Sequence, residues 1–250
     1  MKRGLTLVIS LEERDDRRKH ILENLNRVRH DFLFIDANRP ADMPINMQSS
    51  AIAIWSSHVL ALETFLLTDS DFTLVLEDDV YLENALADKV IASLDCLGRL
   101  LQEDFSIMQL GTMNFVSQNS FRAMMSRIYF MIFGYHRYDK NDLIRLKKYL
   151  GLDKFKRLRL ALTNCLDMSC SPLFGFNIGA QAYIINRNGA QEIVQDFKAR
   201  TDWDLESIYG IDTWLADLSH SYDLKPRCFR TSIQLLVQRK TQSDNIHRRL

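Results

Sequence analysis

Short hydrophobic runs alternate with amphipathic segments along the first part of the chain. The runs at 4–10, 32–35, 72–76 and 105–110 are bounded by polar residues and are short, so they predict strands rather than helices. The run at 72–76 is apolar on both of its faces, as expected for an interior strand of a mostly parallel sheet.

Hydrophobic residues recur at helical spacing between these runs. Segments 15–28, 50–65 and 84–101 predict helices, and Ser49 or Ser50 is a suitable N-cap for the second of them. Alternation of strands and helices indicates an α/β fold, in which helices flank a doubly wound sheet.

Residues 112–171 interrupt this alternation. They contain few strand signals and many basic, methionine and aromatic residues, so we expect a mainly helical insertion or lid within one domain that spans 1–250. Beyond the insertion we expect a strand at 176–185, a helix from 188, a short helix at 211–218 and one more apolar run at 233–237.

Composition is that of an ordinary globular protein, with 46% hydrophobic and 26% charged residues, which excludes disordered and collagen-like classes. The four cysteines contain no CxxC pair, so we predict free thiols and a cytoplasmic, reducing compartment. We also expect neither a signal peptide nor a segment that spans a membrane.

Three consecutive carboxylates, Glu77, Asp78 and Asp79, follow the predicted strand at 72–76. Such a cluster at the carboxyl end of a buried strand repels itself and requires a compensating cation, and this end of an α/β sheet is where ligands bind. Mg²⁺ or Mn²⁺ fits, because these ions take one or two carboxylates and complete their coordination with water and substrate phosphate. The alternative is a solvated acidic turn that caps the following helix.

Several short motifs stand in order along the sequence. They are Ile9-Ser10-Leu11 with Arg14, Arg17 and Arg18; Asp36-Ala37; Ser57-His58; Leu76-Glu77-Asp78-Asp79; Gly179 to Ile185 with Gly189-Ala190; Asp212-Thr213-Trp214-Leu215; and Pro226, Gln234 and Ser243 to Ile246. Together these motifs resemble those of the bacterial lipopolysaccharide glycosyltransferases of family 25. The chain departs from the family at 51–56, where the family usually has a Gly-Cys pair before the Ser-His.

The resemblance implies a GT-A-like fold and transfer of galactose from a UDP-sugar donor to lipooligosaccharide. It implies that Asp79 is a direct ligand of a divalent ion, with Asp78 as a second ligand. Alternatively, Glu77 or Asp78 contacts the ribose or a water bound to the metal. A third ligand often comes from late in the chain, which makes Asp244 and His247 candidates, although such residues in a polar tail are more often simply solvated.

An inverting transfer needs a base for the acceptor hydroxyl, and the resemblance favours Asp212; on the residues alone, Asp212 is equally well explained as a helix N-cap. The remaining candidates bind the donor. They are Arg14, Arg17 and Arg18, which suit phosphates; Asp36, which suits the nucleoside; Ser57 and His58; and Gly179, which allows close approach of the backbone to the sugar. For the arginines the alternative is an exposed first helical turn, and for His58 it is a core histidine.

The zero net charge, with 32 basic and 32 acidic side chains, conceals an uneven distribution and gives no reason to expect nucleic acid as a partner. Residues 61–104 hold eleven acidic and two basic side chains, whereas 122–159 hold eleven basic and three acidic ones. The basic segment suits a lipid-linked oligosaccharide acceptor that carries phosphate, or peripheral contact with the inner face of the cytoplasmic membrane. A solvated helical face explains it equally well.

Two other functions remain open at this point. A metal-dependent phosphohydrolase or nuclease also uses carboxylates at strand ends, but the sequence offers no second cluster of ligands. A non-catalytic family member that acts as a binding scaffold is suggested by the altered segment at 51–56, and the presence of all three carboxylates argues against it.

Overall fold

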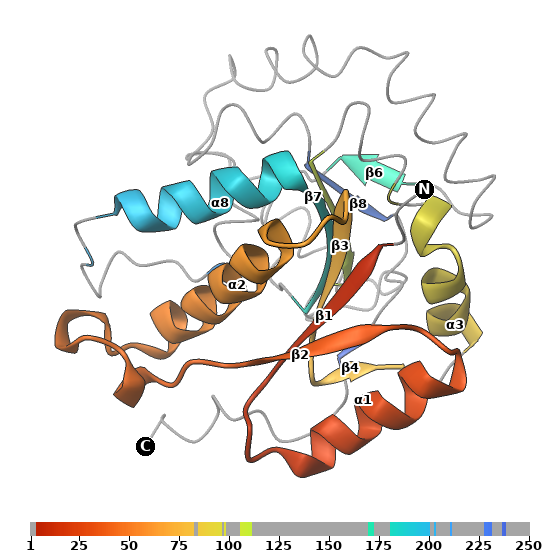
Figure 1. The fold of residues 1–250 in the computed structure, drawn as a ribbon, viewed down its shortest axis with the longest axis horizontal. Helices are drawn as coiled ribbons and strands as arrows, with labels where there is room; N and C mark the ends of the chain where they lie inside the picture. The colour runs from red at the N-terminus through yellow and green to blue at the C-terminus, as the bar shows by residue number, and fades with distance from the viewer. Residues whose placement is uncertain are drawn as a thin grey trace, which may run out of the picture.

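A computed structural model describes residues 4–82, 85–96, 98, 106–111, 170–172, 181–200, 203, 211, 228–231 and 237–238. These residues form a twisted sheet with α2 and α8 on one face and α1 and α3 on the other (Figure 1). The elements, in chain order, are β1 (Leu5–Ser10), α1 (Asp15–Arg27), β2 (Phe32–Asp36), the 3-10 turns η1 (Pro40–Asp42) and η2 (Ile45–Met47), α2 (Ser50–Leu66), β3 (Phe72–Glu77), β4 (Val80–Tyr81), α3 (Ala85–Ala92), β5 (Ile107–Gly111), β6 (Cys170–Pro172), β7 (Ala182–Asn186), α8 (Arg187–Ala199), β8 (Cys228–Thr231) and β9 (Val237–Gln238).

The main sheet has the strand order β2-β1-β3-β7-β5-β8-β6. The first three strands are parallel, whereas β7 runs antiparallel to both of its neighbours, β3 and β5. Among the described strands of this sheet, β2, β1, β3, β5 and β8 run in one direction and only β7 and β6 run against them, so the predicted α/β class with a mostly parallel sheet is confirmed. A separate two-stranded sheet pairs β4 with β9.

The alternation of side chains along β1 and β3 supplies both faces of the sheet with apolar residues. Leu7, Ile9 and Val75 pack with Trp55 and Leu62 of α2 in one continuous core that also includes α8. The intervening residues of the two strands are also buried, so both faces are covered by other elements. This two-sided burial explains why β3 is hydrophobic throughout.

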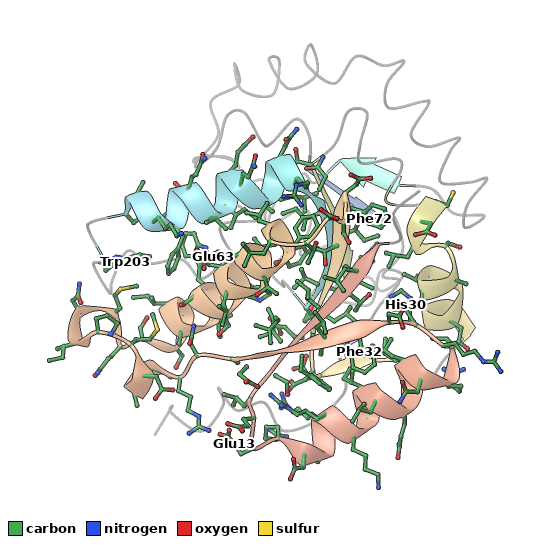
Figure 2. The ribbon with its side chains drawn as sticks, in the orientation of Figure 1. Glu13, His30, Phe32, Glu63, Phe72 and Trp203 are labelled. Atoms are coloured by element: carbon green, nitrogen blue, oxygen red, sulfur yellow. The ribbon has the colours of Figure 1, made fainter. Side chains whose placement is uncertain are left out.

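Capping interactions fix both ends of α2. The Ser49 hydroxyl accepts a hydrogen bond from the Ile52 amide, which confirms the predicted N-cap. At the other end, the Arg187 guanidinium donates to the carbonyls of Leu66, Thr68 and Ser70, so the start of α8 is fastened to the end of α2. Glu63 of α2 (labelled in Figure 2) also pairs with Lys198 of α8.

Two glycines accommodate the buried ring of Phe72 at the start of β3 (Figure 2). A Cβ atom on Gly4 would lie 2.1 Å from the ring, and one on Gly98 would lie 2.2 Å from it. Both positions therefore exclude a side chain as long as Phe72 keeps its place.

The structure differs from the sequence predictions at several boundaries. The strand predicted at 176–185 is β7, which begins at Ala182 and ends at Asn186, and the helix predicted at 84–101 contains the shorter α3. The short strands β4, β6, β8 and β9 were not predicted; β6 lies at the end of the predicted insertion, whose residues 112–169 are outside the described part of the chain. Cys96 is disulfide-bonded, so the prediction of free thiols is wrong there and the cysteines no longer support a reducing compartment.

In the part of the chain that the structure describes, no helix combines the length and hydrophobicity that crossing a membrane requires.

Candidate active site

The carboxyl ends of three parallel strands meet at one edge of the sheet. Ser10 at the end of β1 is in register with Asp36 at the end of β2, and Ile9 is in register with Glu77 at the end of β3. The loop that leaves β1 at this edge contains Glu13 (Figure 2), which pairs with Arg39 from the loop after β2. Residues far apart in sequence thus line the edge where ligands of open α/β sheets bind.

Asp78 is fixed on the α1 side of the sheet. Arg17 of α1 donates to Asp78 Oδ1 at 2.8 Å, and the Ser10 hydroxyl donates to Asp78 Oδ2 at 2.7 Å. Arg17 and Asp78 are buried, with 7% and 8% of their side chains exposed. Each carboxylate oxygen of Asp78 therefore already accepts a hydrogen bond from the protein.

Glu77 turns to the opposite face, because successive residues of a strand alternate. Its Oε1 lies 3.3 Å from Nε2 of His58 in α2, and Nδ1 of His58 lies 3.0 Å from the Tyr183 hydroxyl of β7. His58 and Tyr183 are almost fully buried, whereas a quarter of the Glu77 side chain is exposed. The histidine is therefore a hydrogen-bonded residue of the core, which was one of the two hypotheses from the sequence. It also contacts the acidic segment, by which we mean Glu77, Asp78 and Asp79.

Negative charge accumulates at the end of β3. Burial, together with the charges of Asp79 and Asp78, raises the pKa of Glu77 to about 8, while Arg17 acts in the opposite direction. Asp79 is buried as well, with 6% of the residue exposed. The opposing effect of Arg17 is the smallest of these effects, so the three carboxyl groups favour a further cation.

The other two arginines of the β1–α1 region have separate partners. Arg18 lies over the ring of Phe34, donates to the Ser10 carbonyl at 3.2 Å, and forms an ion pair with Asp36, which is exposed. Arg14 precedes α1 at the N-cap position without a side-chain cap, and it donates two hydrogen bonds to Asp16, at 3.0 Å each, which lowers the pKa of Asp16 to about 2. The structure therefore brings Arg17, Arg18 and Asp36 to the strand ends and gives Arg14 the role of an N-terminal helix residue.

Ser57 has a structural partner at the same edge. Its hydroxyl accepts a hydrogen bond from the Asn38 amide at 2.8 Å and donates to the Ala53 carbonyl at 2.7 Å. Ser57 therefore fastens the loop after β2 onto α2. The altered segment at 51–56 is helical throughout, so its departure from the family pattern leaves α2 intact.

Three residues of this region were missed by the sequence reasoning: Ser10 and Tyr183 as partners, and Asn38 as a loop anchor. Ser10 and Tyr183 stand inside quoted motifs, but their roles depend on contacts with residues 68 and 125 positions away. The period of the strand alone could have predicted that Glu77 and Asp78 point to opposite faces of the sheet.

Gly179, Asp212, Asp244 and His247 lie outside the described residues, so they remain sequence predictions. Ile211, next to Asp212, is helical and buried. β9 pairs with β4 directly after Asp79. In the described residues, no group of three or more His, Cys, Asp or Glu side chains is arranged to hold a metal ion.

Comparison with known families resolves the class of the protein. The family model for glycosyltransferase family 25 (LPS biosynthesis protein) matches residues 5–208. The chain belongs to glycosyltransferase family 25. Membership confirms the resemblance found in the sequence, and it supports glycosyl transfer rather than phosphoester hydrolysis, with a sugar donor and a lipopolysaccharide acceptor in general.

The fold agrees with this family 25 assignment. The chain is similar to the crystal structure of a glycosyltransferase involved in the glycosylation of the major capsid of PBCV-1, with a TM-score of 0.52 and 8% sequence identity. The similarity covers 96% of this chain and 95% of that chain, and it supports the predicted GT-A-like fold. No curated protein sequence matches this family 25 chain.

Proposed function

We propose that the protein transfers galactose from UDP-galactose to a lipooligosaccharide acceptor by a metal-assisted, inverting reaction. The observation that carries this proposal is the acidic segment at the end of β3, where Asp78 is fixed by Arg17 and Ser10, and Glu77 and Asp79 stand beside it. In a family 25 fold, this edge of the sheet is the natural position for the donor diphosphate.

The residues present fit a divalent cation that is shared with substrate. A site built entirely from protein needs more ligands than the described residues provide. Mn²⁺ and Mg²⁺, however, bind nucleotide substrates through one or two carboxylates and the phosphates. We assign Asp79 as the direct ligand, with Glu77 toward the ribose or a coordinated water, and Asp244 or His247 as further ligands. When bound, the ion would offset the charge on the departing diphosphate.

For Asp78 we propose a structural role instead of the metal ligation that the sequence suggested. Both of its oxygens already accept hydrogen bonds, so we assign it to hold the turn between β3 and β4 in place, and direct ligation is left to Asp79. We assign Arg18, in the first turn of α1, to a donor phosphate and Asp36, at the end of β2, to the nucleoside. Their ion pair supports this assignment, because Asp36 is exposed and the pair can exchange partners when the donor binds.

We assign Asp212 as the general base. Its carboxylate would take the proton of the acceptor hydroxyl while that oxygen bonds to the anomeric carbon and the bond from this carbon to UDP breaks. The products are the glycosylated acceptor and UDP, with inversion at the anomeric carbon. The basic residues at 122–159 would bind phosphate on the acceptor or the anionic surface in which it is embedded.

The test is UDP release from a panel of UDP-sugars, with purified lipooligosaccharide as acceptor and with Mn²⁺, Mg²⁺ or EDTA. We expect turnover with UDP-galactose that requires the metal. We also expect Asp79→Asn to lower kcat at least about a hundredfold, because the charge on the leaving group would lose its compensation. Asp88→Asn is the matched control, since Asp88 is a carboxylate that pairs with Arg27 away from the strand ends.

Three results would each remove part of the proposal. Turnover that persists in EDTA excludes the metal, and normal turnover of Asp212→Asn excludes that base. A protein that binds UDP but releases none from any UDP-sugar would be a non-catalytic member of the family.

A further inference from the structure

A chain of buried polar groups leads from the interior of the protein to the acidic segment. It begins at the Tyr183 hydroxyl, passes through both ring nitrogens of His58, and ends at Glu77 Oε1, with separations of 3.0 and 3.3 Å. Tyr183 is 0% and His58 1% exposed. Only the Glu77 end of this chain of three reaches the surface, at the edge that we assign to the donor.

The sheet register explains why these three side chains meet. Tyr183 of β7 is paired with Val75 of β3, and Glu77 follows Val75 on the same face by the two-residue period. His58 reaches this face from α2 and stacks on the Tyr183 ring, with 5.7 Å between ring centroids and an angle of 27°. The imidazole is thus held by its plane and by both nitrogens.

Burial of an imidazole and a phenol hydroxyl at this position costs free energy unless their polar atoms are hydrogen-bonded. The surrounding core consists of residues such as Ile9, Trp55 and Val59, and an apolar pair would fill the same space without the need to satisfy buried polar atoms. The polar chain instead restricts the Glu77 carboxylate. When Nε2–H of neutral His58 donates to Glu77, Nδ1 accepts from the Tyr183 hydroxyl, so a single tautomer of the imidazole serves both contacts.

We propose that His58 and Tyr183 are positioning residues, which orient the Glu77 carboxylate for the metal-bound UDP donor without touching it. This inference rests on the proposed function, since the ligand at Glu77 is the one assigned there. Partners of this kind commonly contribute a factor of about ten to a hundred to the affinity of a metal site. The same arrangement makes His58 a determinant of donor binding although it is buried.

The test uses two variants that remove one contact each. Tyr183→Phe deletes the hydroxyl and keeps the ring, and His58→Asn keeps a polar group near Nδ1 but deletes Nε2. Val59→Ala is the matched control, because Val59 is the neighbouring buried residue of α2 and belongs to the apolar core. Calorimetry gives the Kd of UDP in the presence of Mn²⁺, and thermal unfolding gives the stability of each variant.

We expect His58→Asn and Tyr183→Phe to raise the Kd of UDP with Mn²⁺ by about tenfold. The double variant should be no worse than His58→Asn, since the tyrosine acts through the histidine. Val59→Ala should lower Tm and leave the Kd at the wild-type value. The inference is overturned if the two variants are folded and bind UDP as the wild type does, or if Val59→Ala weakens binding as much as they do.

The outcome separates this inference from the proposed function. A wild-type protein that binds UDP with Mn²⁺ but does not turn over any UDP-sugar contradicts the transfer reaction, while the comparison of Kd values still decides the role of His58. A wild-type protein that turns over UDP-galactose, with variants of unchanged Kd, overturns the inference alone. Failure of the wild type to bind UDP overturns both.

Discussion

Replacing Arg17 by methionine would remove the buried cation that holds Asp78. The two side chains are less than a tenth exposed and are joined at 2.8 Å, so the substitution leaves a carboxylate in a poorly hydrated place. Loss of one partner of a buried pair typically costs about 3–5 kcal/mol. The hydrogen bond from Ser10, at 2.7 Å, remains and places the expected loss near the lower end of that range.

The assay is urea unfolding of the metal-free protein at pH 7, with circular dichroism as the readout. Arg27→Met is a suitable control, because Arg27 lies on the same helix and pairs with Asp88 where both side chains are substantially exposed. An exposed pair contributes up to about 1 kcal/mol, so the control should lose less than that. A loss for Arg17→Met as small as that of the control would refute the argument from burial.

A second variant covers the case in which Arg17→Met does not fold. Combining it with Asp78→Leu removes both charges, so the double variant should recover part of the lost stability. If the two substitutions were instead additive, Arg17 would act on the fold through contacts other than Asp78.

Three further predictions concern the fold and its pH dependence. Gly98→Ala should lower the free energy of unfolding by about 1–3 kcal/mol, because the added Cβ overlaps the Phe72 ring. In a Phe72→Leu background the same substitution should cost less. An equal cost in both backgrounds would contradict the overlap. Arg187→Ala should lower the free energy of unfolding by about 1–3 kcal/mol, because three carbonyls at the end of α2 lose their donor, and Arg187→Lys should lower it less. A thermal unfolding curve that neither substitution changes would contradict this role of Arg187. The folded-state pKa of Glu77, about 8, lies above the ordinary value of 4.5, so the stabilisation of the metal-free fold by this group is complete below about pH 4.5 and is lost as the pH rises to 8. Urea unfolding in EDTA should therefore show the advantage of wild type over Glu77→Gln shrinking across that interval, and a constant or growing difference would contradict the pKa shift.

The sequence predicted best those elements whose signal is local. β1, α1, β2, α2 and β3 each carry their own hydrophobic period, and the Ser49 cap has a recognised residue preference. The convergence of the strand ends also followed, because parallel strands place their carboxyl ends at one edge. These features need no knowledge of distant pairing.

The remaining features depend on which strand lies beside which. The antiparallel β7 is as apolar as a parallel strand, so its direction cannot be read from its composition. β4 and β9 contain two residues each and are too short to show a period. The contacts of Asp78 with Arg17 and Ser10 span 61 and 68 positions of the chain, and they became visible only when α1 and β3 were placed on the sheet.

The pairing of β4 with β9 has a consequence for the order in which the protein acquires its shape. β1, α1, β2 and β3 leave the ribosome early and can begin to associate while synthesis continues. β4, directly after the acidic segment, obtains its strand partner only when Val237 and Gln238 have emerged, some 158 positions later in the sequence. A nascent chain that stops before Val237 carries every acidic residue of the segment and still lacks the β9 side of this pairing. Premature termination between Thr231 and Val237 should therefore yield a product that contains every described strand of the main sheet, while β4, directly after Asp79, lacks its pairing with β9.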